Sequence, residues 1–189
     1  MTLPIAWQIL YWTWVASEVV IGIATRTRQS TGRVHDRGSL LLLWVVVFSS
    51  MTAAIWISEV TPPNLFGGSR SLKLAGLVVL VIALAIRWTA IYTLGKSFSS
   101  NVAILDSQSL NRSGLYRYVR HPSYLGLMLV FLSVGLHSRN WLSLAIAVVP
   151  TTAALLYRIR VEESALRQAF GDAYVSYSKE VSRLIPGLF

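Results

Sequence analysis

Residues 72–94 read LKLAGLVVLVIALAIRWTAIYTL, an apolar run that contains two charges, Lys73 and Arg87. About 20 apolar residues, rising about 1.5 Å each, are enough for a helix to cross a bilayer. We count five such runs: Leu3–Thr25, Leu40–Val60, Leu72–Leu94, Pro122–Leu136 and Trp141–Tyr157. The fourth run is short by itself, and we expect flanking residues to extend it. The first lacks a basic leader and a small-residue cleavage pattern, so we interpret it as a mature span.

The composition agrees with this interpretation. Of the 189 residues, 54% are hydrophobic and 13% are charged, and the mean hydropathy is +0.56. A soluble globular chain carries about 25% charged residues. We therefore predict an all-α, polytopic membrane protein with about five transmembrane helices and a C-terminal amphipathic helical tail. Residues 1–189 form a single domain, with three spans in 1–94 and a polar loop, a helical hairpin and the tail in 95–189.

The net charge of +9 is unevenly distributed. If the N-terminus lies outside and the spans alternate, 13 of the 17 Lys and Arg residues lie inside: Arg26, Arg28, Arg33, Arg37, Lys96, Arg112, Arg117, Arg120, Arg158, Arg160, Arg167, Lys179 and Arg183. Only Arg70, Lys73 and Arg139 lie outside, and Arg87 lies within a span. The positive-inside rule predicts this bias. The basic residues thus orient the chain and meet anionic lipid, which disfavours a nucleic-acid partner.

The chain contains no cysteine and only three histidines. The absence of cysteine excludes disulfides, thiolate nucleophiles and Cys-ligated zinc. His35, His121 and His137 are far apart in sequence and form no His-x-x-x-His or His-Glu pair on one helical face. We therefore expect no metal site.

The last two spans form a helical hairpin, because the connection HSRN at 137–140 is short. The hairpin brings RHPSY, at 120–124, beside LLYRIRVEE, at 155–163. Beyond Arg160, apolar residues at helical spacing predict an amphipathic surface helix from Val161 to Phe170. After Gly171, a second helix carries Tyr174, Tyr177 and Val181.

RHPSY holds more than a helix start requires. Pro122 is favoured at the first helical position and holds His121 extended. Free backbone N–H groups at that end bind anions. The simpler interpretation is a capped helix with Tyr124 in an aromatic belt. Across the hairpin, Arg158 and Glu162 share a helix face at i, i+4 spacing. We expect Glu163 to point elsewhere and to be solvated.

Two charged residues, Glu18 and Arg87, lie well inside apolar spans and not at their ends. An arginine near the bilayer centre costs about 2.5–3.5 kcal/mol on insertion scales. Arg87 either snorkels to the membrane edge or faces inward and pairs with an anionic ligand. Placing the charge of Glu18 in a membrane span is also costly. Glu18 would neutralise a basic partner that the sequence does not identify.

Two stretches carry a resemblance to a known family: GLYRYVRHPSYLG at 114–126 and RIRVEESALRQAFGDAYVSYSKEVSRLIP at 158–186. Together they resemble the isoprenylcysteine carboxyl methyltransferase family, whose wider relatives include the membrane phospholipid N-methyltransferases. The likeness is strong over the C-terminal half and reaches back more weakly to Arg87 and Gly95. Membrane sterol reductases carry a run similar to RHP-x-Tyr-x-Gly. The Glu-Glu, Phe-Gly and Tyr-x-x-Tyr elements make the likeness more specific.

The resemblance implies methyl transfer from S-adenosylmethionine, with S-adenosylhomocysteine as product, to a lipophilic acceptor such as the carboxylate of a prenylated cysteine. It implies cofactor contacts from Gln108, Ser109, Leu110, Asn111, Tyr116, His121, Pro122, Ser123, Tyr124 and Glu162. It also implies that Arg158 faces the substrate and that Arg87 lies near the reacting group. The stretch AILDSQSLN at 103–111 is shorter than the family's usual loop, and Gln108 stands where His is common.

A carboxylate acceptor is ionised at neutral pH, so no general base is required. Holding the nucleophile, methyl and sulfur in line supplies about 7–11 kcal/mol. Three other functions remain open. They are phospholipid N-methylation, an NADPH-dependent reduction like that of sterol reductases, and a membrane scaffold without enzymatic activity.

Overall fold

The chain folds into a bundle of long helices. The structure, a computed structural model, describes residues 3–25, 33–34, 38–99, 103–104 and 110–187. The α-helices in this part are α1 Leu3–Ala24, α2 Ser39–Val60, α3 Ser71–Leu94, α4 Pro122–Ser138, α5 Trp141–Phe170 and α6 Asp172–Glu180. Each apolar run therefore forms a helix, and the first four have nearly the predicted bounds.

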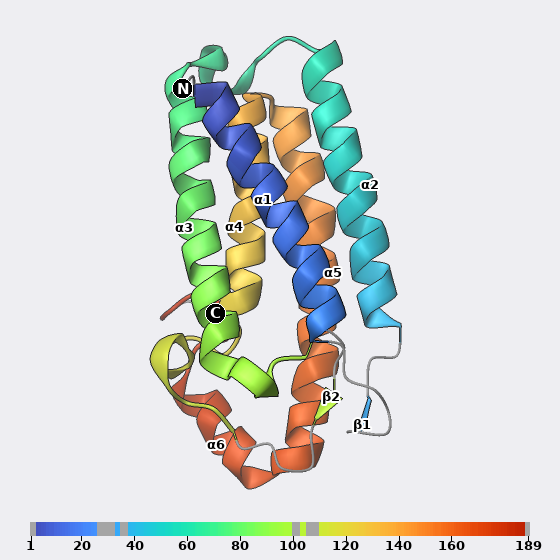
Figure 1. Cartoon of the computed structure of the whole chain (residues 1–189), viewed down its shortest axis with the longest axis vertical. Helices are drawn as coiled ribbons and strands as arrows, with labels where there is room; N and C mark the ends of the chain where they lie inside the picture. The colour runs from blue at the N-terminus through green and yellow to red at the C-terminus, as the bar shows by residue number, and fades with distance from the viewer. Residues whose placement is uncertain (1–2, 26–32, 35–37, 100–102, 105–109, 188–189) are drawn as a thin grey trace.

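Short elements connect these helices. They are the 3-10 helices η2 Leu65–Gly68, η3 Gly95–Ser97 and η4 Gly114–Arg117, and the strands β1 Arg33–Val34 and β2 Ala103–Ile104. The strands pair antiparallel, Arg33 with Ile104 and Val34 with Ala103. Figure 1 shows the N-terminus at one end of the bundle, and β1, β2 and α6 at the other.

Three helices are long and apolar enough to cross a membrane: α2, α3 and α5. Helix α4 is apolar but shorter, with 17 residues. These findings confirm the predicted all-helical architecture in its coarse form, with membrane-spanning helices.

The bundle has an open side. Helix α3 packs along α4, α2 packs along α5, and α4 also touches α5. Helix α1 packs on α3, whereas α1 and α2 hardly touch each other. Figure 1 shows α1 running between α3 and α2 on the near face. The bundle is therefore loosest between its first two helices.

Glycine allows α3 and α4 to approach closely. A Cβ on Gly126 of α4 would lie 2.8 Å from the Arg87 Cβ and 3.0 Å from the Ala83 carbonyl oxygen. Small residues permit such backbone contact between apolar helices. Gly126 therefore fixes the level at which Arg87 meets the start of α4.

Helix α5 is longer than the sequence predicts. One helix runs from Trp141 to Phe170, well beyond the apolar run that ends at Tyr157. No glycine or proline lies between Arg158 and Phe170, so the backbone has no reason to leave the helix there. The helix ends at Gly171, which adopts a φ of 52°, a conformation that favours glycine. Residues 161–170 are therefore helical, as predicted, and they continue α5.

Candidate active site

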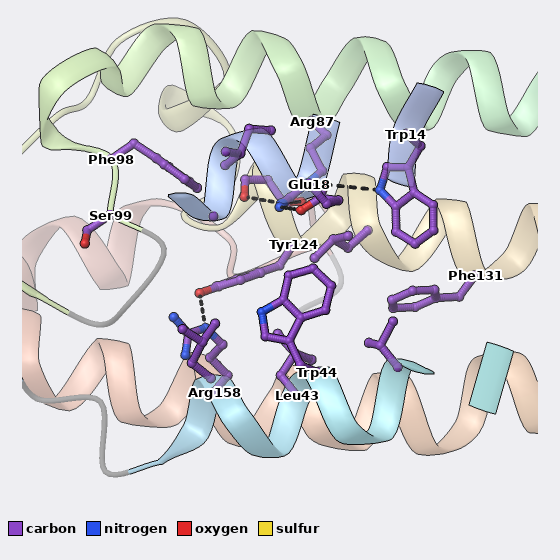
Figure 2. A pocket seen from close by; sticks show the side chains of 16 residues that line it. Trp14, Glu18, Leu43, Trp44, Arg87, Phe98, Ser99, Tyr124, Phe131 and Arg158 are labelled. Carbon is purple, nitrogen blue, oxygen red and sulfur yellow. Dashed lines mark hydrogen bonds and ion pairs between the residues drawn. The ribbon is translucent and has the colours of Figure 1, made fainter. Parts of the chain in front are cut away.

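A pocket lies between α1 and α2 and reaches the start of α4. About 580 Å³ of empty space lies within it, open solvent at its mouth included. Its lining is mostly apolar: Trp14, Glu18, Ile21, Gly22, Leu40, Leu43, Trp44, Val47, Arg87, Phe98, Ser99, Ser123, Tyr124, Leu127, Phe131 and Arg158. Figure 2 shows that Tyr124 and Arg158 point toward each other, while Trp14 and Phe131 lie further along the pocket.

Tyr124 is the polar centre of this region. Its hydroxyl donates to Glu162 Oε2 at 2.7 Å and accepts from Arg158 Nε at 3.1 Å. The His121 ring stacks on the Tyr124 ring with the centroids 5.7 Å apart. The hairpin therefore brings RHPSY beside YRIRVEE, as predicted, and His121 and Glu162 share a neighbour.

Arg158 is held from two sides. Besides its bond to Tyr124, its Nη1 donates to Ser39 Oγ at 2.9 Å, and the residue is only 2% exposed. Ser39 is the first residue of α2. Sequence reasoning missed Ser39, because a serine at the start of an apolar run is usually read as a helix cap.

Arg87 does not snorkel. Its Nε donates to Glu18 Oε1 and its Nη2 to Glu18 Oε2 at 2.6 Å. Both residues are buried. The cation thus faces inward, as one interpretation predicted, and its partner is the carboxylate of α1. Trp14 Nε1 also donates to Glu18, at 3.1 Å.

Glu163 is buried, not solvated as the sequence reasoning expected. It is 4% exposed and accepts from Arg120 Nη2 at 3.0 Å and Arg183 Nη2 at 3.0 Å. His121 Nε2 lies 3.3 Å from the same carboxylate. The prediction failed because these partners are remote in sequence.

Arg120, His121, Glu163 and Arg183 form a cluster, the Glu163 cluster, that holds the C-terminal segment against the start of α4. The Arg120 N–H donates to the Ser182 carbonyl at 2.8 Å, and the His121 N–H to the Arg183 carbonyl at 3.1 Å. Arg120 Nη1 also donates to the Ser178 carbonyl at 2.8 Å. His121 is thus held between this cluster and Tyr124.

The loop residues are placed as follows. Gln108 and Ser109 lie outside the described residues, and Leu110 is half-buried. The Asn111 side chain donates to the Thr93 carbonyl at 3.1 Å and accepts from the Ser113 N–H at 2.8 Å. Asn111 thus ties the end of the loop to α3.

Tyr116 lies beside the Glu162 region and does not line the pocket. Its carbonyl accepts from the Tyr177 hydroxyl at 2.5 Å. Burial raises the pKa of Tyr116 well above its ordinary value, and the charge of the nearby Glu162 adds to this. Both Pro122 and Ser123 are buried in the first turn of α4. The predicted site residues within the described part therefore gather around the start of α4.

Comparisons with known proteins point to one family. The model of the isoprenylcysteine carboxyl methyltransferase (ICMT) family matches residues 75–168. Protein-S-isoprenylcysteine O-methyltransferase B of Arabidopsis thaliana is 32% identical over 113 residues, which cover 59% of this chain and 57% of the plant protein. The protein-S-isoprenylcysteine O-methyltransferase of Rattus norvegicus is 30% identical over 156 residues, 78% of this chain and 54% of the rat protein.

A solved structure agrees with the sequence relatives. It is described as the eukaryotic intramembrane Ras methyltransferase ICMT without a monobody, and it is 26% identical with a TM-score of 0.61. The match covers 76% of this chain and 52% of the solved one. The chain thus spans a little over half the length of the relatives named here. Residues 75–168 are thus similar to the isoprenylcysteine carboxyl methyltransferase family.

Proposed function

We propose that the chain transfers a methyl group from S-adenosylmethionine to a lipophilic acceptor, the C-terminal carboxylate of a prenylated cysteine or a similar lipid-linked carboxylate. One observation carries this proposal. Tyr124, Arg158 and Glu162 converge beside a pocket whose other walls are largely apolar. The relatives, whose names describe this activity, support the same assignment.

The pocket suits an acceptor with a long apolar chain and one charged end. Leu43, Trp44 and Val47 of α2 line it, on the side where α1 and α2 hardly touch. Arg158 lines it as well. A guanidinium fixes a carboxylate through its planar fork. We assign the acceptor carboxylate to Arg158, because Glu18 already neutralises the charge of Arg87, whereas the described acceptors of Arg158 are neutral hydroxyl groups.

The residues around the start of α4 fit the methyl donor. Glu162 is half-buried. Its carboxylate can accept hydrogen bonds from an amino group or from the hydroxyl groups of a ribose. The stacked rings of His121 and Tyr124 offer the aromatic surface that attracts a cation. We propose that these residues hold the donor with Pro122, Ser123, Tyr116 and the loop residues Gln108, Ser109, Leu110 and Asn111. When bound, the sulfonium supplies the methyl group and keeps the electrons of the broken carbon–sulfur bond.

The protein contributes orientation and exclusion of water. A carboxylate is ionised at neutral pH, so no side chain has to remove a proton. Arg158 is buried and braced by hydroxyl groups of Ser39 and Tyr124, which limits its motion. Placing the reacting groups in line accounts for about 7–11 kcal/mol of the barrier. The product is a methyl ester, which no longer carries the charge that Arg158 binds.

We further propose that α1 and α4 cross the membrane with α2, α3 and α5, giving five spans with the N-terminus outside. Helix α1 packs on α3, and α4 packs between α3 and α5. The arrangement places 13 of the 17 basic residues inside, as the positive-inside rule requires. The site around Tyr124 then faces the cytoplasm, where a water-soluble donor meets an acceptor that enters from the bilayer.

Two measurements on the purified full chain test the function. S-adenosylhomocysteine should raise the melting temperature, because a ligand that binds the folded state stabilises it. Radiolabelled methyl should pass from S-adenosylmethionine to farnesylated N-acetylcysteine and not to its carboxamide. Methylation of phosphatidylethanolamine instead, or a thermal shift with NADPH only, would contradict the proposal.

Matched variants locate the chemistry. Arg158→Ala should reduce methyl transfer strongly, while Arg160→Ala, at an exposed position two residues along α5, should not. Glu162→Gln should weaken S-adenosylhomocysteine binding by about 1–3 kcal/mol, and exposed Glu180 offers a control in Glu180→Gln. Equal binding by both glutamine variants and the parent would exclude Glu162 from the donor site.

A further inference from the structure

The Glu18–Arg87 ion pair connects the first helix to the residues around Tyr124. Glu18 belongs to α1, Arg87 to α3, and Ser123, which Arg87 also contacts, to the first turn of α4. The pair itself lines the pocket. The sequence predicts only that Glu18 neutralises a basic partner, and the proposed methyl transfer does not use it.

Burial makes this ion pair energetically costly. The side chains of Arg87 and Glu18 are 6% and 5% exposed. Taking two charges out of water costs several kcal/mol per ion, and apolar residues of similar size are often as stable or more so. Stability alone is therefore a weak reason for an ion pair at this position.

Glu18 sets the direction of Arg87. Its two oxygens take Nε and Nη2 of the guanidinium, so the planar group is held at two points. Trp14 Nε1 fixes Oε1 from one turn earlier on α1, at 3.1 Å. Figure 2 shows Trp14, Glu18 and Arg87 joined in this order. Because Nε and Nη2 both donate to Glu18, the direction of the remaining guanidinium nitrogen, Nη1, is fixed.

That nitrogen anchors the start of α4. Arg87 Nη1 donates to the Ser123 carbonyl at 3.1 Å and to Ser123 Oγ at 2.9 Å. Gly126, one turn later, lets α4 approach Arg87 closely. Both contacts fix the rotation and depth of the turn that carries Tyr124.

We propose that Glu18 is a positioning residue: through Arg87 and Ser123 it sets the place of Tyr124 relative to Arg158 and Glu162. Tyr124 has to meet Glu162 at 2.7 Å and Arg158 at 3.1 Å at the same time. A small shift of its helix turn breaks one of these bonds. A misplacement of about 1 Å costs up to about 10²-fold in rate.

The first test does not depend on the proposed function. With 3-fluorotyrosine in place of Tyr124, fluorine NMR in detergent micelles reports the surroundings of that ring. Glu18→Gln should shift or split the fluorine signal, whereas Glu59→Gln, at an exposed position on α2, should leave it unchanged. A signal that is the same in Glu18→Gln and the parent overturns the proposal.

The kinetic test rests on the proposed function. Glu18→Gln should lower kcat for methyl transfer by about tenfold and change the KM of the acceptor far less. A higher kcat/KM would mean that Glu18 competes with the acceptor for Arg87, which overturns the positioning role. If the parent shows no methyl transfer while the fluorine signal moves, the proposed function fails and the positioning role stands.

A double variant separates positioning from charge compensation. Glu18→Met with Arg87→Met removes both buried charges, and replacements of this kind often preserve stability. It should melt no lower than the parent, yet show a displaced fluorine signal and a kcat about tenfold lower. A parental kcat and fluorine signal in this variant would show that the pair does not position Tyr124, and would overturn the inference.

Discussion

Glu163→Gln should be among the most damaging single substitutions outside the apolar core. The carboxylate is the common acceptor for Arg120, His121 and Arg183. Glutamine keeps the shape and one acceptor oxygen but removes the negative charge. The cations that remain then face one another at the junction between α4, α5 and the C-terminal segment.

The magnitude follows from the exposure of the partners. Breaking a buried ion pair by removing one member costs about 3–5 kcal/mol. The side chains of Arg120 and His121 are 8% and 3% exposed, so water compensates them poorly. The Arg183 side chain is 27% exposed, so water partly solvates its charge. We therefore expect a loss at the lower end, about 3 kcal/mol, or about 6–12 °C in melting temperature for a chain of this size.

The neighbouring glutamate provides the matched control. Glu162 accepts one described hydrogen bond, from the Tyr124 hydroxyl at 2.7 Å. Glu162→Gln should therefore cost about 1 kcal/mol, or about 2–4 °C. Melting curves from circular dichroism, recorded in one detergent for both variants, make the comparison. Equal losses in the two variants would refute the structural role that we assign to Glu163.

Two further predictions concern packing and pH. Gly126→Ala should destabilise the bundle by about 1–3 kcal/mol through overpacking, whereas Gly22→Ala, with no atom within 4 Å of its added Cβ, should not; equal melting temperatures would contradict the close approach of α3 and α4. Burial raises the pKa of Tyr177 from 10.0 to about 12, so the folded state holds this proton more tightly than the unfolded chain. The resulting stabilisation is full below pH 10 and is lost as the pH rises through about 12. Tyr177→Phe should flatten the fall in melting temperature over this interval and Tyr92→Phe, at a site 88% exposed, should not; equal slopes in the two variants would contradict the assignment.

The sequence predicts the helices because their signals are local. Apolar runs of sufficient length, together with Pro122 and the short 137–140 connection, place α4 and the start of α5 almost as observed. The same reasoning ended the fifth span too early, since it followed hydropathy and not helix breakers. The helix continues into polar sequence until Gly171 permits a different backbone conformation.

The site was predicted less completely because its contacts are long-range. Glu18 and Arg87 are 69 residues apart, and no local pattern identifies one as the partner of the other. The juxtaposition of His121 with Glu162 was accessible because a short hairpin dictates it. For Glu163, the hairpin brings Arg120 and His121 near, but the third partner, Arg183, lies beyond α6 and outside the hairpin.

The different environments of two adjacent glutamates follow from helix geometry. Successive residues of a helix project about 100° apart, so Glu162 and Glu163 face different neighbours. Glu162 meets a neutral hydroxyl beside the pocket. Glu163 meets three groups that carry or accept positive charge. A carboxylate that already pairs with cations is a poor ligand-binding group, because a ligand would have to replace ion pairs that are stronger than its own contacts. A carboxylate that accepts one hydrogen bond from a phenol can give up that bond, or accept a second hydrogen bond from a ligand beside it. We therefore propose that Glu162 has the ligand-binding role in this pair, whereas Glu163 holds the C-terminal segment against the start of α4.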